Sequence, residues 1–222
     1  MKKWTTLDRS LTADGETISL EEHDGSYAIR VNGAMLMSTR QHASEETLAV
    51  LACAHLKRKR GARVLIGGLG LGFTLRAALA ALAPDAAVVV AEVLDAVIAW
   101  NRDPAFHLAA DAMADPRVTV LKQDVGETIR AARNSFDSIM LDVDNGPAAM
   151  SNQSNNRLYD NAGLRSVRAA LRPEGCLAIW SVGPDRAFEG LMASAGFRPD
   201  VRTCRSRPNA GRKHTIFLGR LK

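Results

Sequence analysis

Hydrophobic and polar residues follow two different rhythms along the chain, and the rhythm changes near residue 43. Before that point, apolar and polar residues alternate in short stretches, which is the pattern of strands with one buried face. Asn32-Gly33 separates two of these stretches and favours a type I′ hairpin turn, because both turn residues take positive φ. We predict a small β-meander over residues 1–43 that is too short to bury a core alone and packs on the rest of the chain. The stretches are 17–20, 27–31 and 34–37.

From residue 44 onward, apolar positions recur at helical spacing, and strand-like and helix-like segments then alternate. Ser44 is a favourable N-cap for the first helix, and Glu45 and Glu46 suit the positive end of its dipole. Gly61 ends this helical run. The later predicted strands are 63–66, 87–91, 118–121, 138–141 and 176–181, and the predicted helices are 73–83, 96–101, 127–133, 157–171 and 187–195.

Strands that alternate with helices predict an α/β fold, a Rossmann-like doubly wound parallel sheet, over residues 44–222. The last two apolar segments, 199–204 and 214–218, can pair as an antiparallel edge, which gives seven strands with one of them reversed. In such folds, ligands bind beyond the carboxyl ends of the strands. We therefore expect the residues that carry chemistry to follow Ile66, Ala91, Leu121 and Leu141.

The composition places the chain among globular proteins. Of its 222 residues, 46% are hydrophobic and 24% are charged, which excludes disorder of the whole chain. No apolar run reaches the length that spans a bilayer, and the N-terminus lacks the apolar core of a secretory signal. The three cysteines form no CxxC pair and no even disulfide framework, so we expect a cytoplasmic protein with no membrane partner.

The net charge is +5, from 29 basic and 24 acidic residues. The excess lies in the run 57–60 and in the C-terminal tail, where Lys and Arg are frequent. Such clusters can bind phosphate-rich partners such as nucleic acid, although more often they are solvated surface. The tail contains few aromatic residues, which does not favour a stacking platform for single-stranded nucleic acid. Nucleic acid thus stays an alternative partner that the sequence does not favour.

A glycine-rich turn follows the first predicted parallel strand, at the first place where a ligand is expected. Gly67, Gly68, Gly70 and Gly72 all lie within six consecutive residues. Glycine permits positive φ and leaves room for a ligand beside the backbone, and the N–H groups at the start of the next helix attract a polar group or an anion. The turn alone is weak evidence, because structural turns also contain glycines, but its position favours a nucleoside.

Single acidic residues follow the next two strands. Glu92 can accept hydrogen bonds from both hydroxyls of a ribose, and its charge would repel the phosphate of NADP. A solvated glutamate at a strand end is the alternative. Asp124 can accept an exocyclic adenine N–H, and it is also a natural N-cap for the helix that follows. We expect the ribose at Glu92 and the adenine at Asp124.

Two carboxylates, Asp142 and Asp144, follow the fourth strand, beside the turn Gly146-Pro147. Like charges that are held close together raise each other's pKa and are costly unless a cation is present. The pair therefore indicates a cationic ligand, which could be an amine, a sulfonium ion or a metal. No His or Cys joins the pair, so we expect no metal. An ordinary turn of Asp and Asn residues is the alternative interpretation.

Five segments carry a family resemblance: VLIGGLGLG (64–72), AEVLDAVIAWN (91–101), QDV (123–125), FDSIMLDVDNGPAA (136–149) and LY (158–159). Together they resemble spermidine synthases, which are polyamine aminopropyltransferases with the class I methyltransferase fold. The resemblance covers nearly the whole chain, including the small N-terminal β region. Its most specific part is the fourth segment, whereas the glycine turn alone would fit any class I methyltransferase.

The resemblance implies a role for each matching residue. The four glycines of the turn would cradle the amino-acid side of the nucleoside, Glu92 would hold the ribose and Asp124 the adenine. Asp142 matches the family's catalytic carboxylate and Asp144 its amine-binding partner, while Tyr159 is near a substrate-lining aromatic residue. The implied co-substrate is decarboxylated S-adenosylmethionine or S-adenosylmethionine, with no metal. A homodimer is also implied.

The chain departs from the family at several positions that line the polyamine side of the site. Gly70 stands where the family has an Asp, and Leu94 stands where its second-strand motif has an Asp. A family Gln falls on Leu36, and a family Tyr-His pair falls on Ser44-Glu45. The nucleoside half of the motif is thus kept, and the polyamine half is altered.

The leading interpretation is a spermidine synthase-like transferase that binds an S-adenosylmethionine-type nucleoside and moves its aminopropyl group to an amine acceptor. A methyltransferase that depends on S-adenosylmethionine is the main alternative, because Gly70 leaves the carboxylate of that donor without an opposing charge. A non-catalytic or nucleic-acid-binding relative is a third interpretation, which the basic tail motivates.

Overall fold

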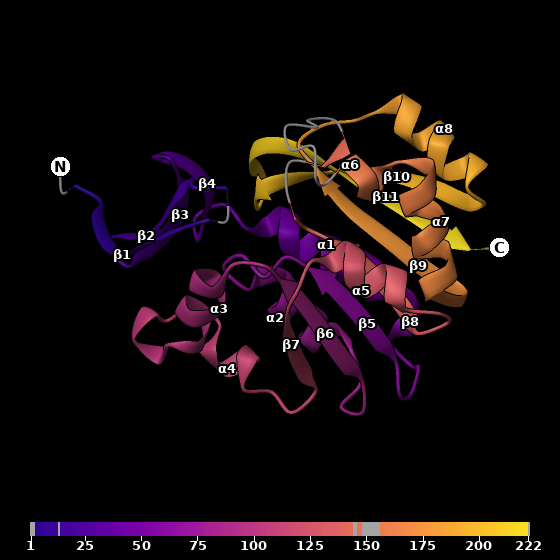
Figure 1. Ribbon diagram of the computed structural model, residues 1–222, viewed down its shortest axis with the longest axis horizontal. Helices are drawn as coiled ribbons and strands as arrows, with labels where there is room; N and C mark the ends of the chain where they lie inside the picture. Colours follow the sequence, from indigo (N-terminus) through magenta and orange to yellow (C-terminus); the bar gives the residue numbers. More distant parts are fainter. Residues whose placement is uncertain (1–2, 13, 144–145, 148–155, 222) are drawn as a thin grey trace.

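The computed structural model describes residues 3–12, 14–143, 146–147 and 156–221, and it contains two β-sheets (Figure 1). The N-terminal sheet is antiparallel, with the strand order β1-β2-β3-β4. Its strands are β1 (Thr5–Leu11), β2 (Thr17–His23), β3 (Ser26–Val31) and β4 (Ala34–Ser38). The sequence predicted three of them and missed β1. All side chains of β1 except the half-buried Ser10 are exposed, so no alternating buried face marks this strand.

The N-terminal sheet confirms the predicted turn and the predicted packing. Asn32 and Gly33 have φ angles of 49° and 80°, as a type I′ turn requires. The buried apolar side chains of this sheet join one hydrophobic core with the second sheet, so the meander does not stand alone. These side chains include Ile18, Leu20 and Ile29.

The second sheet is mixed and has seven strands in the order β10-β11-β9-β8-β5-β6-β7. The strands β5, β6, β7, β8 and β9 are parallel to one another, whereas β11 is antiparallel to β9 and β10 is antiparallel to β11. This arrangement confirms the predicted doubly wound sheet with its antiparallel edge. The strands are β5 (Arg63–Gly67), β6 (Ala87–Glu92), β7 (Val118–Lys122), β8 (Phe136–Leu141), β9 (Leu171–Ser181), β10 (Phe197–Arg207) and β11 (Ala210–Leu221).

Helices cover both faces of the second sheet. They are α1 (Ala43–Cys53), α2 (Phe73–Ala81), α3 (Asp95–Arg102), α4 (Ala110–Met113), α5 (Val125–Ala131), α6 (Asn156–Tyr159), α7 (Asn161–Ala170) and α8 (Arg186–Ser194), with 3₁₀ turns at Ala54–Leu56 and Pro104–Phe106. Val64 and Ile66 of β5 face the core shared with α1, α2 and α3, whereas Leu65 faces the core shared with α5, α7 and α8. All residues of β5 after the exposed Arg63 are therefore buried, and the strand is covered on both faces. No helix in the described part of the chain is long and apolar enough to cross a membrane.

The start of α1 differs from the prediction. The helix begins at Ala43 with His42 as its N-cap residue, so the expectation that Ser44 is the cap was wrong. Ser44 lies instead in the first turn, 1% exposed, and its hydroxyl donates a hydrogen bond to the carboxylate of Glu45. The hydroxyl therefore binds a neighbouring side chain and does not cap the helix.

The helix predicted over 157–171 is interrupted. The side chain of Asp160 accepts a hydrogen bond from the backbone N–H of Gly163 at 2.7 Å and starts α7 as a new helix after α6. Leu171 already belongs to β9. Asp160 thus caps a new helix in the middle of a stretch whose apolar periodicity predicts one continuous helix.

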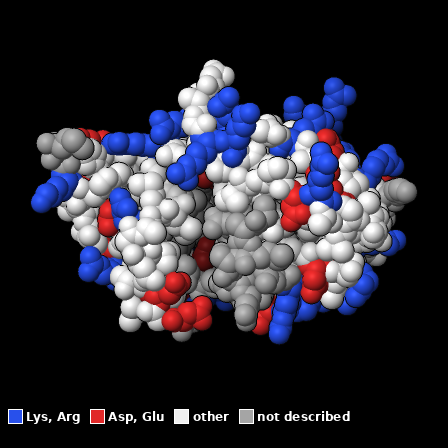
Figure 2. All heavy atoms as spheres, turned by 90° about the horizontal axis from the view of Figure 1, so that it is seen from above, with Lys and Arg blue, Asp and Glu red and all other residues white. Residues whose placement is uncertain are grey.

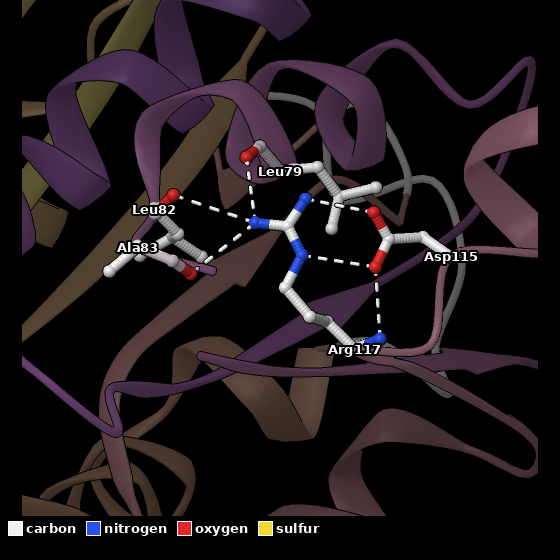
Figure 3. Close-up of polar contacts among 5 residues, drawn as sticks. All are labelled: Leu79, Leu82, Ala83, Asp115 and Arg117. Carbon is white, nitrogen blue, oxygen red and sulfur yellow. Dashed lines mark hydrogen bonds and ion pairs between the residues drawn. The ribbon is translucent and has the colours of Figure 1, made fainter. Parts of the chain in front are cut away.

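Ion pairs hold the amino-terminal edge of the second sheet, and Arg117, just before β7, shows how (Figure 3). Its guanidinium pairs with Asp115 through Nε at 3.0 Å and Nη2 at 2.8 Å. Its Nη1 donates to the carbonyl oxygens at the end of α2, those of Leu79, Leu82 and Ala83. The hydrogen bonds from Arg117 lower the pKa of Asp115 to about 2. Arg117 thus satisfies carbonyls that the last helical turn leaves unpaired.

Candidate functional site

A cavity of about 490 Å³ lies at the carboxyl ends of β5, β6, β7 and β8 and is closed on one side by residues of the N-terminal sheet. Figure 2 shows a hollow in the middle of the molecule seen from above, with Asp or Glu atoms inside it. The acidic side chains that line the cavity are Glu45, Glu92, Asp124 and Asp142. The structure thus brings three of the predicted acidic residues to one edge of the sheet, together with one that the sequence did not assign.

Gly68 and Gly70 let the turn after β5 lie directly against neighbouring segments. Gly68 has a φ of +86°, and a Cβ there would lie 2.3 Å from the carbonyl oxygen of Asp142. Gly70 has a φ of +52°, and a Cβ there would lie 2.6 Å from Sδ of Met37. Both positions therefore favour glycine, and both line the cavity.

Gly67 and Gly72, the other two glycines of the turn, contact the protein interior. A Cβ at Gly67 would meet the side chain of Val125 at 2.8 Å, and one at Gly72 would meet Cβ of Ala109 at 2.3 Å. Gly72 is also the N-cap residue of α2, with a φ of 81°. These two glycines shape the turn, but they are not among the described residues that line the cavity.

Glu92 ends β6 and is 8% exposed. Its carboxylate accepts hydrogen bonds from the backbone N–H groups of Leu69 and Leu94, both at 2.9 Å. The bond from Leu69 ties the glycine turn to the end of β6. Each carboxylate oxygen can accept a second hydrogen bond, so Glu92 is a fixed acceptor in the wall of the cavity.

Asp124 follows β7 and caps α5 by accepting a hydrogen bond from the backbone N–H of Glu127 at 3.0 Å. The predicted N-cap is thereby confirmed. Its side chain remains 45% exposed and lies 3.8 Å from Arg130. A carboxylate has acceptor capacity beyond this one bond, so capping the helix and contacting a ligand are compatible.

Asp142 follows β8. The hydroxyl of Thr74 donates to its Oδ2 at 2.8 Å, and its own N–H donates to the carbonyl oxygen of Gly67 at 2.9 Å. Burial, and after it the charge of Glu45, raises the pKa of Asp142 to about 7, although the hydrogen bond from Thr74 acts in the opposite direction. A carboxyl group that titrates near neutral pH can accept a proton from a reacting group and release it again.

Glu45 is the acidic neighbour to which the sequence assigned no role. It lies in the first turn of α1, is 7% exposed, and accepts a hydrogen bond from the Ser44 hydroxyl at 2.5 Å. Burial raises the pKa of Glu45 above its usual value. In the sequence, the position of Glu45 at the start of a predicted helix explains it as an acid that suits the positive end of the helix dipole. The departure from the family at Ser44-Glu45 pointed to this position without giving it a role.

Two other candidates do not join this set. Asp144 lies outside the described residues, so its pairing with Asp142 stays a prediction. Tyr159 is 4% exposed and packs edge-on against Phe188, with the ring centroids 6.0 Å apart. It belongs to the core beneath α5, α7 and α8 and is not among the described residues that line the cavity, so its substrate role also stays a prediction.

The C-terminal strands supply a further wall that the sequence analysis did not connect with the site. Its residues are Trp180, Ser206, Arg212 and His214. The rings of Trp180 and His214 lie with their centroids 4.6 Å apart, and Arg212 is exposed. The antiparallel pairing of β11 with β9 brings these residues together, and hydrophobic periodicity does not reveal such a long-range contact.

The fold and the cavity define a class of protein. A doubly wound sheet with a glycine turn after its first parallel strand, and with acidic side chains at the ends of the next strands, is typical of Rossmann-like proteins that bind a nucleoside at this edge. Among the residues that the structure describes, no three His, Cys, Asp or Glu side chains are grouped so that they could hold a metal ion.

Comparisons with solved structures give a narrower similarity. The chain matches a spermidine synthase in complex with the transition-state analogue AdoDATO, with a TM-score of 0.72, 19% identity, and coverage of 98% of this chain and 72% of that one. It matches the spermidine synthase from Thermotoga maritima with a TM-score of 0.75, 18% identity, and coverage of 98% and 72%. It also matches a probable spermidine synthase from Corynebacterium glutamicum, with a TM-score of 0.67, 16% identity, and coverage of 99% and 81%. No family model and no curated protein matches the chain. The chain therefore has the fold of spermidine synthases, at low sequence identity.

Proposed function

We propose that this protein is a spermidine synthase-like transferase, which binds an S-adenosylmethionine-type nucleoside and transfers its aminopropyl group to a small-molecule amine. The observation that carries the proposal is the position of Asp142, which lies after β8 in the same cavity as Glu92 and Asp124. The fold shared with spermidine synthases supports the proposal.

The donor nucleoside would lie along the ends of β5, β6 and β7. Glu92, fixed by two backbone N–H groups, would accept the ribose hydroxyls, and Asp124 would accept the adenine N–H. Gly68 and Gly70, which line the cavity, would face the amino-acid side of the donor. This arrangement would aim the sulfonium carbon of the donor toward Asp142.

The acceptor amine must lose a proton before it reacts, because amines of this kind have a pKa near that of Lys, about 10.4. Asp142 would accept that proton, and Asp144, by resemblance, would hold the remaining ammonium group. The lone pair of the nitrogen then forms the new C–N bond while the C–S bond breaks. The sulfur leaves as a neutral thioether, and the positive charge passes to the nitrogen. Positioning the two reactants can supply up to about 7–11 kcal/mol of the acceleration.

A methyltransferase is the second candidate, and the environment of Gly70 favours it. The thioether of Met37 fills the space over Gly70, where a side chain would meet Sδ at 2.6 Å. No charged group can project from this position, so the carboxylate of S-adenosylmethionine would meet no like charge here. The same cavity would then hold the carboxylated donor.

Donor titrations and product analysis test the proposal. Isothermal calorimetry with S-adenosylmethionine and with its decarboxylated form identifies the preferred donor, and mass spectrometry of incubations with diamines and polyamines detects the aminopropyl product. Transfer of a methyl group without any aminopropyl product would replace the proposal with the second candidate.

Glu92→Ala tests the nucleoside half by itself. The change should weaken nucleoside binding by about tenfold or more, because it removes the acceptors assigned to the ribose hydroxyls. Asp95→Ala is the matched control, since Asp95 is an exposed acid just beyond Glu92 that pairs with Lys122. Affinity that is equal in both variants would remove the ribose assignment.

A further inference from the structure

Glu45 and Asp142 approach the cavity from different elements, and one hydroxyl lies between them. Thr74, in α2, donates its hydroxyl hydrogen bond to Oδ2 of Asp142 at 2.8 Å. The same hydroxyl oxygen lies 3.4 Å from the backbone carbonyl oxygen of Glu45, in the first turn of α1. Both carboxylates line the cavity. The two acids are therefore neighbours in the structure, although 96 positions between residues 45 and 142 separate them in the sequence.

The charge of this pair is not neutralised by the described part of the protein. Neither carboxylate forms an ion pair with Lys or Arg among the residues that the structure describes. The nearby His42 lies 2.9 Å from Glu46, an exposed acid on the outer side of the same helical turn. The hydroxyls of Ser44 and Thr74 donate to one oxygen of each carboxylate, and carboxylate oxygens can accept further bonds. A buried carboxylate beside a half-buried one, with no Lys or Arg partner, is costly unless a proton or a cationic ligand joins them.

We propose that Glu45 is a substrate-binding residue that holds the ammonium group of the acceptor amine together with Asp142. The identity of the amine as an acceptor rests on the proposed transferase function. An ammonium group has three N–H donors, which match carboxylate oxygens presented from two sides. Arg212 also lines the cavity, but in the described structure its exposed side chain forms no ion pair with either carboxylate.

The two carboxylates would divide the work at this position. The ammonium group would enter with both carboxylates ionised, and a proton held by Asp142 would go to solvent as it binds. Asp142 then takes one proton from the ammonium group and leaves a neutral amine with a lone pair. Glu45 accepts a hydrogen bond from one of the remaining N–H groups and orients the nitrogen for attack.

Glu45→Gln and Glu46→Gln form a matched pair of variants that tests this role. Glu45→Gln should raise the KM for the amine by about tenfold or more, because it removes one of the two carboxylate charges that would attract the ammonium group. It should change kcat less than KM and leave the affinity for the nucleoside unchanged. Glu46→Gln alters the same charge on the same helical turn, outside the cavity, and should change none of these constants.

A pH profile separates this role from a structural one. Without the neighbouring charge, Asp142 should ionise more readily, so the acid limb of kcat/KM should move to lower pH in Glu45→Gln and stay in place in Glu46→Gln. The groups that face Glu45 from the packed elements are His42, Ser44, Glu46, Thr74, Asp142 and Cys204. A variant that was merely misfolded would lower the folded fraction without moving this limb.

Direct binding of 1,4-diaminobutane, measured by calorimetry on the full-length protein, keeps this test separate from the transfer reaction. The assignment is supported if the wild type and Glu46→Gln bind the diamine and Glu45→Gln binds it at least about tenfold more weakly. This holds even if no aminopropyl product is ever found. In that case the proposed function fails and the amine site stands. Equal binding by Glu45→Gln, or no binding by the wild type, overturns the assignment. Should Glu45→Gln not fold, Ser44→Ala, which removes the hydroxyl donor to Glu45, should weaken amine binding in the same direction.

Discussion

The two edges of the seven-stranded sheet treat their acidic side chains in opposite ways. At the amino-terminal edge, Asp115 is neutralised by a two-point contact with Arg117. At the carboxyl-terminal edge, Glu92 accepts hydrogen bonds from backbone N–H groups and Asp142 accepts one from a hydroxyl, and neither has a Lys or Arg partner within the described ranges. An edge that only stabilises the fold can neutralise its acids internally. In the cavity, Glu92 and Asp142 keep acceptor capacity that the described part of the protein does not use.

Strand β8 shows the contrast within six residues, because an aspartate lies near each end. Asp137, 1% exposed, forms ion pairs with Lys59 at 2.7 Å and with Arg172 at 2.8 Å, and it accepts the backbone N–H of Arg63 at 2.7 Å. Asp142 accepts one hydroxyl and has another acid as its neighbour. The same residue type is thus an ion-pair partner at one end of β8 and, just beyond the other end, the proton acceptor that we propose.

The pKa values of the two aspartates move in opposite directions for this reason. Burial by itself raises the pKa of Asp137, but the hydrogen bonds from Lys59 and Arg63 and the charge of Arg172 bring it below its usual value. At Asp142, burial raises the pKa to about 7, and no base reverses that effect. The comparison predicts opposite consequences when each acid is replaced by its amide.

The largest expected effect is the loss of turnover in Asp142→Asn. The amide cannot accept the proton of the acceptor amine, so kcat should fall by about 10²–10⁴-fold. Its carbonyl oxygen can still accept the Thr74 hydroxyl, so the nucleoside affinity should remain close to that of the wild type. Steady-state kinetics and calorimetry measure the two quantities. Turnover that is unchanged would remove Asp142 from the reaction and abolish the functional contrast between the two ends of β8.

Asp137→Asn should have the next largest effect, on stability rather than on chemistry. The unfolding free energy at pH 7 should fall by about 2–3 kcal/mol, toward the lower end for a broken buried ion pair, because Lys59 and Arg172 stay partly solvated. Urea denaturation measures this loss. Since the pKa of Asp137 is lowered in the folded state, its contribution is present above the usual carboxyl pKa and disappears as the pH falls through the folded value.

Asp85→Asn is the control for that measurement. Asp85 also lies at the amino-terminal edge and pairs with Arg60 at 3.1 Å, but both side chains are exposed. An exposed pair contributes little, so this variant should unfold close to the wild type. Equal losses in both variants would mean that burial of the Asp137 ion pairs does not matter, which contradicts the comparison.

Much of this arrangement could be predicted from the sequence, because it depends on local patterns. Alternation of strands and helices gave the parallel order of the sheet and hence the edge at which Glu92, Asp124 and Asp142 lie together. A strand and the acidic residue that follows it are neighbours in the sequence, so this pattern can be recognised without knowing the fold. The glycine turn is local in the same sense, although only Gly68 and Gly70 of its four glycines line the cavity.

The remaining parts of the site depend on contacts between distant segments. Glu45 has the pattern of an ordinary first-turn acid, and only the packing of α1 against the sheet turns it inward. Trp180 and Arg212 both line the cavity because β11 returns beside β9. The strand β1 was missed because its side chains face solvent. Neither periodicity nor residue type contains this long-range information.

The smallest expected effect is a gain of stability in Asp142→Asn. This variant tests whether the ionised carboxylate of Asp142 destabilises the folded protein. A folded-state pKa of about 7, above the usual carboxyl value of 3.8, means that ionisation of Asp142 opposes folding as the pH rises from about 4 to about 7. The neutral amide avoids this cost, so the variant should have a higher Tm than the wild type at pH 8, by about 2–4 °C for each kcal/mol recovered in a chain of this size. At pH 4 the difference should vanish, because the wild-type carboxyl is then protonated in the folded state. Thermal unfolding of both proteins at the two pH values measures it. A variant that is less stable than the wild type at pH 8 would show that the carboxylate is stabilised by the fold, as Asp137 is, and the two ends of β8 would no longer differ in kind.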